Sequence, residues 1–465
     1  MLSRFGAADM IVTNTTVRAE LRALLALAWP IMLTQLSMMS LGVVDLMMVG
    51  RYGVDAVGAV ALGNICKIGT AMIAMGLVLG IDPFLAQAHG ARDARGLALG
   101  LQRGVVLALV TALPVALIWL WVEDFLLLMR QDPAVAAIAH DYVLVQLPSI
   151  PLFLIYTAQR QYLQSRGILR PALWVALGAN VLNVVLNWAL IFGHLGCPEL
   201  GAVGSGIATS IVQCCMPLAM LFLMRSGRLC EKAWVPWSRA ALDPRELRAI
   251  LAVGVPIGLH FAAEIWGFHV AGLWAGWLGK EALAANSVVL NLASISFMLP
   301  LGVGLAVVTR VGNLVGAGHP REAQKAAWAA LLLGAGLMSA SALVFLMVRE
   351  PLALAYSEDP AVIALAASIL PIAAAFQLFD GLQVVAAGVL RAIGRTGATA
   401  VANLLGYYAL GLPLGYYLAF PAGLGLAGIW WGIASGVAAV AVSLVVWVAV
   451  RGPATARGIT DRTAT

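Results

Sequence analysis

The sequence predicts an all-α integral membrane protein with twelve transmembrane helices in two six-helix lobes. Three observations support this prediction. The 465-residue chain is 62% hydrophobic and only 11% charged, whereas a soluble domain carries about 25% charged residues. Apolar runs long enough to cross a bilayer as helices recur from one end of the chain to the other. The second half of the chain also repeats residue patterns of the first half.

Twelve apolar runs are candidate spans, and polar intervals separate them. The runs are 24–50, 57–81, 102–122, 138–158, 171–193, 203–224, 250–276, 283–308, 326–348, 362–390, 398–420 and 426–449. The longest polar interval divides them into two sets of six. We therefore expect the following segments: an N-terminal segment at 1–23, an N-lobe at 24–224, an inter-lobe linker at 225–249, a C-lobe at 250–449 and a tail at 450–465.

Lysine and arginine predict how the spans are oriented. If the N-terminus is cytoplasmic, 23 of the 28 Lys and Arg residues fall on the cytoplasmic side. The five assigned to the outer side are Arg51, Lys67, Arg130, Lys280 and Arg349. The positive-inside rule then places both termini and the linker in the cytoplasm. These loops account for the net charge of +6, so we expect no nucleic-acid partner.

The two halves of the chain match in the same order at a nearly constant offset. Pro30 in AWPIMLTQ corresponds to Pro256 in GVPIGLHF. The segment QDPAVAAIA (131–139) corresponds to EDPAVIALA (358–366) at almost the same offset. Both halves begin on the same side of the membrane, which makes them parallel repeats. Parallel repeats around a midplane site are typical of secondary transporters, and a duplicated scaffold without transport is the alternative.

Asp380 is a carboxylate near the middle of the apolar run 362–390. A charged group at this depth costs about 2.5–3.5 kcal/mol on insertion scales, so its presence suggests a function. At helical spacing Phe376, Gln377, Asp380 and Gln383 share one face, opposite an apolar face. This face predicts a polar site directed toward protein or water. A structural aspartate bonded to a neighbouring helix is the alternative.

Glu264 is a second carboxylate in the C-terminal half, in the middle of the run 250–276. His260 precedes it by one turn and Phe268 follows it by one turn. The i, i+4 spacing lets His260 and Glu264 pair. We interpret the pair as functional, although a lone histidine on an apolar helix is more often a structural core residue.

Asp45 is the main carboxylate candidate of the N-terminal half, toward the outer end of the first span. Arg51 at the outer interface is a possible structural partner for it. In the fifth span Asn180, Asn183 and Asn187 form one stripe at i, i+3 and i+7. Three amides cannot face lipid without partners. They either connect helices by hydrogen bonds or line a hydrated cavity opposite Asp45.

Several catalytic and cofactor signatures are absent from the sequence. It contains no GxxxxGK[ST] loop for ATP, no HExxH and no GxSxG. We therefore expect neither an enzyme nor a bound cofactor, and uphill transport has to use an ion gradient.

Six segments resemble the multidrug and toxic compound extrusion (MATE) family, most closely its NorM-like bacterial branch. They are PIMLTQ (30–35), VVDLMMVGRYG (43–53), LQSRGILRPALWVALGANVLNVVLNWALIFG (163–193), GAVGSGIATSIVQ (201–213), NLASISFMLPLGVGLAVVTRVGNLVGAG (291–318) and FDGLQVVAAGVLRAIGRT (379–396). The resemblance covers about residues 20–450. It implies two lobes facing a central cavity in the bacterial inner membrane. It also implies export of cationic lipophilic compounds in exchange for Na⁺ or H⁺, and we expect a monomer.

The resemblance also implies roles for particular residues. Glu264 and Asp380 match the C-lobe carboxylates that couple to the cation, which makes them candidate Na⁺ ligands. Asp45 matches the N-lobe aspartate, and Asn180 matches its polar partner. Phe376 departs from a sodium-coupled member, which has tyrosine there, so the coupling ion stays open between Na⁺ and H⁺.

A lipid-linked oligosaccharide flippase of the same superfamily is the alternative function. Flippases usually have a more cationic cavity and often extra helices. The membrane carboxylates and the twelve spans favour drug export.

Overall fold

The computed structural model describes residues 16–230, 235–456 and 458, apart from the side chains of residues 54 and 55. The predicted N-terminal segment, linker and tail therefore lie partly outside the described residues. Over the described part the chain is helical and contains no strand. The first nine helices are α1 (Val17–Gly50), α2 (Val54–Leu79), α3 (Asp82–Gly90), α4 (Ala94–Trp119), α5 (Val122–Leu128), α6 (Pro133–Leu144), α7 (Ser149–Ser165), α8 (Arg170–Ile191) and α9 (Gly201–Ser226).

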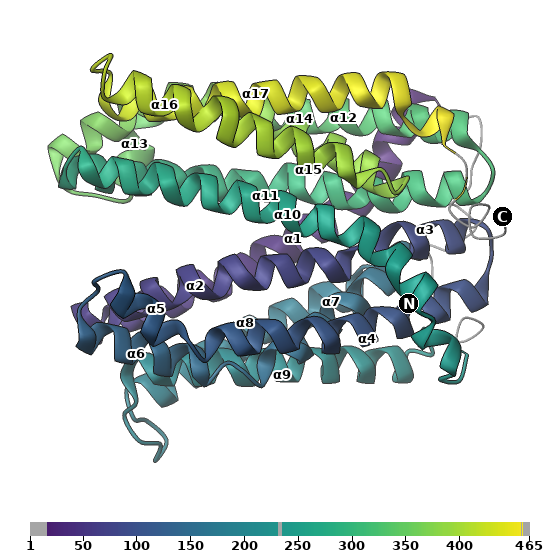
Figure 1. Cartoon of the computed structure of the whole chain (residues 1–465), viewed down its shortest axis with the longest axis horizontal. Helices are drawn as coiled ribbons and strands as arrows, with labels where there is room; N and C mark the ends of the chain where they lie inside the picture. Colours follow the sequence, from purple (N-terminus) through teal and green to yellow (C-terminus); the bar gives the residue numbers. More distant parts are fainter. Residues whose placement is uncertain (1–15, 231–234, 457, 459–465) are drawn as a thin grey trace. The chain divides into compact units, whose positions relative to one another are not determined.

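The remaining helices begin within the predicted linker and continue to the C-terminal part of the chain (Figure 1). They are η2 (Arg239–Leu242), α10 (Pro244–Trp277), α11 (Lys280–Gly316), α12 (Pro320–Met347), α13 (Arg349–Leu354), α14 (Pro360–Ala392), α15 (Thr396–Leu404), the π-helical segment η3 (Leu405–Gly411), α16 (Leu412–Ala419), α17 (Gly425–Arg451) and η4 (Pro453–Thr455). Each of the twelve predicted spans overlaps one of these helices or a consecutive group of them.

Ten helices in the described part are long and apolar enough to cross a membrane. The pair α6 and α7, bent by 49° at a short break, corresponds to another span. The remaining predicted span, 398–420, consists of α15, η3 and α16. Here Gly406 and Gly411 lie against Gly436 on α17: a Cβ on Gly436 would meet Gly406 O at 2.5 Å. Glycine permits this close approach beside the π-helical segment.

The chain forms two compact units that are not contiguous in sequence. One unit contains residues 33–85 and 93–258, and the other contains residues up to 32, 86–92 and those from 259 onward. We call them the N-unit and the C-unit. Two of the boundaries fall just after Pro30 and Pro256, which lie inside α1 and α10. Proline interrupts the hydrogen-bond ladder of a helix.

The first turns of α1 therefore belong to the C-unit, and the first turns of α10 belong to the N-unit. The contiguous lobes predicted at 24–224 and 250–449 remain an interpretation of the repeat. The compact units differ from them by these exchanged half-helices.

The exchanged half-helices pack at matching positions of the repeat. In the N-unit, a Cβ on Gly76 of α2 would lie 2.3 Å from the Cα of Gly258 on α10. In the C-unit, a Cβ on Gly302 of α11 would lie 3.1 Å from the Cα of Met32 on α1. Small residues allow helices to approach this closely in a membrane protein. Gly76 and Gly302 correspond at the same offset as the two repeat prolines, and so do Met32 and Gly258, so the packing follows the repeat.

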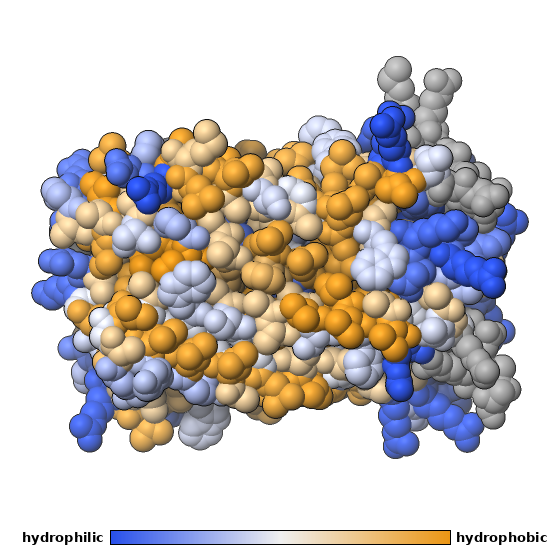
Figure 2. Space-filling view, turned by 90° about the horizontal axis from the view of Figure 1, so that it is seen from above, coloured by the Kyte–Doolittle hydropathy of each residue, from blue (hydrophilic) through white to orange (hydrophobic). Residues whose placement is uncertain are grey.

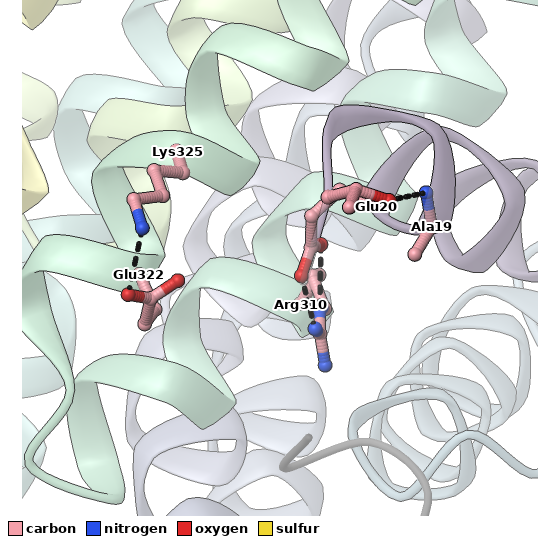
Figure 3. Close-up of polar contacts among 6 residues, drawn as sticks. Ala19, Glu20, Arg310, Glu322 and Lys325 are labelled. Atoms are coloured by element: carbon pink, nitrogen blue, oxygen red, sulfur yellow. Dashed lines mark hydrogen bonds and ion pairs between the residues drawn. The ribbon is translucent and has the colours of Figure 1, made fainter. Parts of the chain in front are cut away.

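A buried ion pair fixes the first half of α1 within the C-unit. Figure 3 shows Arg310 of α11 facing Glu20 of α1. Arg310 Nε donates to Glu20 Oε2 at 3.1 Å, and Nη2 donates to Oε1 at 2.5 Å. Both side chains are only 2% exposed. This two-pronged geometry is the strong form of an arginine–carboxylate contact.

Large apolar side chains are exposed along the helices. Figure 2 shows hydrophobic surface between two regions where hydrophilic residues gather. Leu113, Val181 and Phe222, for example, are 66%, 68% and 69% exposed. Such surfaces are unfavourable in water and suit helices that face lipid.

Candidate functional site

The predicted pair on α10 forms in the C-unit. His260 Nε2 lies 3.5 Å from Glu264 Oε2, one helical turn away. His260 is only 2% exposed. His269, by contrast, contacts the carbonyl oxygen of Ile265 on its own helix at 2.7 Å, which suits a structural role.

The predicted polar face of α14 is buried in the C-unit. Phe376, Gln377, Asp380 and Gln383 are all 4% exposed or less. Asp380 Oδ1 is enclosed and has no hydrogen-bond partner among the described residues. The same holds for both amide atoms of Gln377 and for Gln383 Oε1. Buried polar atoms are nearly always bonded, so this cluster of open atoms is unusual.

Tyr407 brings the π-helical segment η3 to the same cluster. Its side chain is 2% exposed, and its hydroxyl lies close to the side chain of Gln383. Tyr407 interacts electrostatically with both Glu264 and Asp380, and these two carboxyls interact with each other. The structure therefore brings α10, α14 and η3 together around two carboxyl groups.

Aromatic side chains lie one helical turn from each of the two carboxyl groups, since Phe268 follows Glu264 and Phe376 precedes Asp380. Phe268 and Phe376 lie edge to face, with ring centroids 6.0 Å apart. Phe376 also meets Trp430 of α17 at 5.9 Å, and Phe268 meets Tyr407 at 6.1 Å. Edge-to-face contacts are favourable aromatic geometries. The result is an apolar wall beside negative groups, which suits a cationic organic molecule.

Amides from other helices complete this cluster. Gln383 Nε2 donates to Asn403 Oδ1 at 3.0 Å, and Trp430 Nε1 donates to Asn286 Oδ1 at 3.1 Å. Asn403, Asn286, Tyr407 and Trp430 were not predicted from the sequence. The two asparagines carried a usable signal, because each is an amide inside an apolar run. The aromatic residues carried none, because such residues are common in apolar helices.

Asp45 lies at the centre of a separate hydrogen-bonded group in the N-unit. Its Oδ1 accepts hydrogen bonds from Asn183 and Asn187 of α8 at 3.0 and 2.7 Å. Its Oδ2 accepts one from Thr209 of α9 at 2.6 Å. Asn187 also donates to Asn183 Oδ1 at 3.1 Å. All four side chains are buried, and Thr209 was not predicted from the sequence.

Asn180 does not make the contact with Asp45 that the resemblance implied. It donates to Ser37 O and Ser37 Oγ on α1, each at 2.7 Å, rather than to Asp45. Asn183 and Asn187 make the contacts with Asp45 instead. Arg51 makes no ion pair with Asp45 within the described residues. The asparagine stripe thus connects α8 to α1 by hydrogen bonds.

The described part of the chain contains no group of three or more His, Cys, Asp or Glu side chains that could hold a metal ion. Glu264 and Asp380 would therefore need neutral oxygen atoms to complete a cation shell. Hard cations prefer oxygen ligands. The amide oxygens of Gln377 and Gln383, which lack partners among the described residues, are of that kind.

Comparisons with known proteins agree with this fold. A model of the MatE family matches residues 30–189 and 256–417. Multidrug resistance protein PmpM of Pseudomonas aeruginosa is 37% identical over 92% of this chain and 91% of its own. Multidrug resistance protein NorM of Burkholderia vietnamiensis is 35% identical over 90% and 92%. The crystal structure of the eukaryotic MATE transporter AtDTX14 superposes with a TM-score of 0.87 at 25% identity, covering 94% of this chain and 97% of that one.

The two family matches begin at Pro30 and Pro256, the prolines that correspond in the internal repeat. They confirm that repeat. The comparisons also confirm the predicted all-helical membrane fold.

Proposed function

The chain belongs to the MATE family of transporters, and we propose that it is a secondary active multidrug efflux antiporter for cationic lipophilic compounds. One observation carries the proposal. Asp380 is buried and Glu264 is mostly buried, with a side chain 14% exposed, in one cluster beside aromatic rings, and an enclosed oxygen of Asp380 has no partner among the described residues. Buried carboxylates inside a membrane bundle typically belong to substrate or ion pathways.

The exchange begins with the C-unit carboxyl groups attracting an organic cation. Phe268 and Phe376 offer apolar contact, and a positive group over a ring face gains about 0.5–2 kcal/mol. A Na⁺ ion or a proton then neutralises Glu264 or Asp380. The attraction for the drug is lost, and the balance between two helix arrangements shifts. His260 beside Glu264 positions that carboxyl.

The coupling ion is either Na⁺ or H⁺. A Na⁺ ion would use one carboxylate together with the amide oxygens of Gln377 and Gln383. A proton needs only one carboxyl oxygen. Both ions would bind at polar atoms of this cluster that have no hydrogen-bond partner among the described residues. The two ions therefore compete for one site.

We place the protein in the bacterial inner membrane as a monomer, with both termini in the cytoplasm. The distribution of Lys and Arg between the loops supports this orientation. No bound cofactor is part of the proposal.

The test uses purified protein in liposomes loaded with a fluorescent organic cation. An inward Na⁺ gradient at fixed pH is imposed first, and an inward proton gradient at fixed Na⁺ second. Dye efflux driven by either gradient is the expected result and identifies the ion. Folded protein that gives no gradient-dependent efflux would contradict the proposal and favour the flippase alternative.

A further inference from the structure

Lys67 is a cation in the interior of a membrane helix. Helix α2 runs from Val54 to Leu79, so Lys67 falls at its midpoint. At the helical rise per residue it lies about 20 Å along the axis from the first turn. Lys67 was assigned to the outer side of the membrane, and the structure places it within a spanning helix, after the start of α2 at Val54, rather than in a loop.

Within the described residues, the ammonium group of Lys67 contacts neutral groups only. Its Nζ donates to Gln146 Oε1 at 3.0 Å and to Tyr142 Oη at 3.4 Å. It also lies 5.3 Å from the centroid of the Tyr142 ring. Both partners are fully buried, and Lys67 is half-buried. Among the described residues it forms no ion pair.

The polar face of α2 is directed away from its most exposed side. Asn64, Lys67 and Thr70 follow one another at i, i+3 spacing and share an arc. The exposed isoleucines of α2, which are Ile65, Ile68 and Ile73, centre on the other side of the helix. Lys67 therefore points toward α6 and the α6–α7 break rather than straight into lipid. An intramembrane cation without a carboxylate partner indicates a functional site.

We propose that Lys67 binds the carboxylate of zwitterionic substrates, meaning compounds that carry both a cationic centre and a carboxylate. This rests on the proposed function. An ammonium group has three N–H donors, and Gln146 and Tyr142 accept two of them. The third is available to an anion, and its bond to a carboxylate would be charge-assisted and therefore stronger than the two neutral bonds.

Asn64 supplies a second donor at the same place. Its Oδ1 accepts a hydrogen bond from Tyr142 Oη at 3.3 Å. Among the described residues the amide N–H groups of Asn64 donate no hydrogen bond, so they can serve a ligand one turn from Lys67. Together, Lys67 and Asn64 offer a carboxylate one charged and one neutral donor. An ester at that position carries no negative charge, so Lys67 attracts it less strongly.

A structural role for Lys67 is the rival explanation. Gln146 lies in the break between α6 and α7, and the lysine could simply hold that 49° bend in place. The two explanations differ in what removing the lysine does. Loss of a structural contact affects every substrate, whereas loss of an anion site affects only substrates with a carboxylate.

The experiment uses two dyes with the same fluorophore. Rhodamine 19 carries a free carboxylate, and rhodamine 6G is its ethyl ester and only cationic. Binding to the purified full-length protein in detergent is followed by fluorescence anisotropy at neutral pH. Lys67→Met, Lys67→Arg and the exposed control Lys280→Met are compared with the wild type. Thermal unfolding of each variant is measured in parallel.

We expect Lys67→Met to weaken rhodamine 19 binding by about 10- to 100-fold relative to rhodamine 6G, as loss of one charged hydrogen bond implies. Lys67→Arg should keep most of the difference between the dyes, and Lys280→Met should change neither. Equal losses for both dyes, or no change for either, would overturn the anion site.

Two further outcomes keep the test decisive. If Lys67→Met does not fold, Lys67→Gln replaces it. A wild-type protein that binds rhodamine 19 more than about tenfold more weakly than rhodamine 6G also contradicts the inference, because one charged hydrogen bond should at least offset the added negative charge. Failure of the wild type to bind rhodamine 6G would count against the proposed function, whereas loss of the difference between the dyes counts only against Lys67.

Discussion

The N-unit and the C-unit each bury an aspartate at membrane depth, and the two are 4% exposed alike. Asp45 in the N-unit accepts three hydrogen bonds from neutral side chains. Asp380 Oδ1 in the C-unit accepts none from the described residues, and the charged group that acts on Asp380 is another carboxyl, Glu264. The two aspartates are therefore equally buried, but they differ in how far their carboxylate oxygens are hydrogen-bonded.

This difference separates two roles that burial alone cannot distinguish. Neighbouring side chains donate hydrogen bonds to both carboxylate oxygens of Asp45. Asp380 Oδ1 has no such donor within the described part of the chain, so we expect its charge to be balanced by a ligand cation or a proton. We therefore expect exchange to depend most directly on Asp380, and the integrity of the N-unit to depend on Asp45.

The largest expected effect is on transport by Asp380→Asn. The amide carries no charge for Na⁺ or H⁺ to neutralise. Gradient-driven dye efflux should therefore fall by about 100-fold or more. Stability should stay the same or rise, because a poorly compensated buried charge is removed. Efflux from liposomes and thermal unfolding measure the two effects. The control Glu358→Gln, on an exposed residue before α14, should leave both unchanged. Normal efflux by Asp380→Asn would reject the assignment.

A third buried carboxylate sharpens the comparison, because Glu20 is paired with an arginine. Glu20→Ala or Arg310→Ala leaves one charge buried alone, which should cost about 3–5 kcal/mol in the free energy of unfolding. The double variant should be more stable than either single one. The pair of Glu322 and Lys325, 3.0 Å apart with the lysine exposed, is the control, and Lys325→Ala should cost less than about 1 kcal/mol.

Denaturant unfolding in detergent measures these differences. Single variants that are as stable as the wild type would mean that the first half of α1 does not depend on this ion pair.

Asp45→Asn should have a smaller effect on stability. Its new amide N–H₂ would face either the two asparagine donors or the Thr209 hydroxyl, leaving donors without an acceptor. One or two such buried donors cost about 1–3 kcal/mol in total. Denaturant unfolding measures this loss of stability, and Asp380→Asn is measured in the same way for comparison. Equal stabilities of the two variants would show that the hydrogen bonds of Asp45 do not distinguish the two aspartates.

Much of the fold could be predicted from the sequence for a physical reason. Apolar length, loop charge and a repeat at a constant offset are properties of the linear chain, so they can be read without a structure. The pairing of His260 with Glu264 and the shared face of Phe376, Gln377, Asp380 and Gln383 follow from helical spacing within one helix, and both appear in the structure.

Contacts between helices were harder to predict. The stripe of asparagines on α8 gave the correct face, but not which turn of α1 each residue meets. Asn183 therefore contacts Asp45, whereas Asn180 contacts Ser37. Thr209 and Tyr407 come from other helices and complete the two sites through packing. The exchanged half-helices of α1 and α10 were missed because neither proline marks which unit the helix joins.

The smallest expected effect concerns the coupling ion and Phe376→Tyr. The Phe376 ring is 2% exposed and lies against both Phe268 and Trp430, so the added hydroxyl has little room. Overpacking should cost about 1–3 kcal/mol of stability. The same hydroxyl adds an oxygen one turn from Asp380, which favours Na⁺ over a proton because hard cations bind oxygen. Dye efflux should therefore change by about threefold or less, with a stronger dependence on external Na⁺ at fixed pH. Phe192→Tyr in the N-unit, at a partly exposed position after α8, is the control for adding the hydroxyl without overpacking. An unchanged Na⁺ dependence in Phe376→Tyr would mean that this position does not influence the choice of ion.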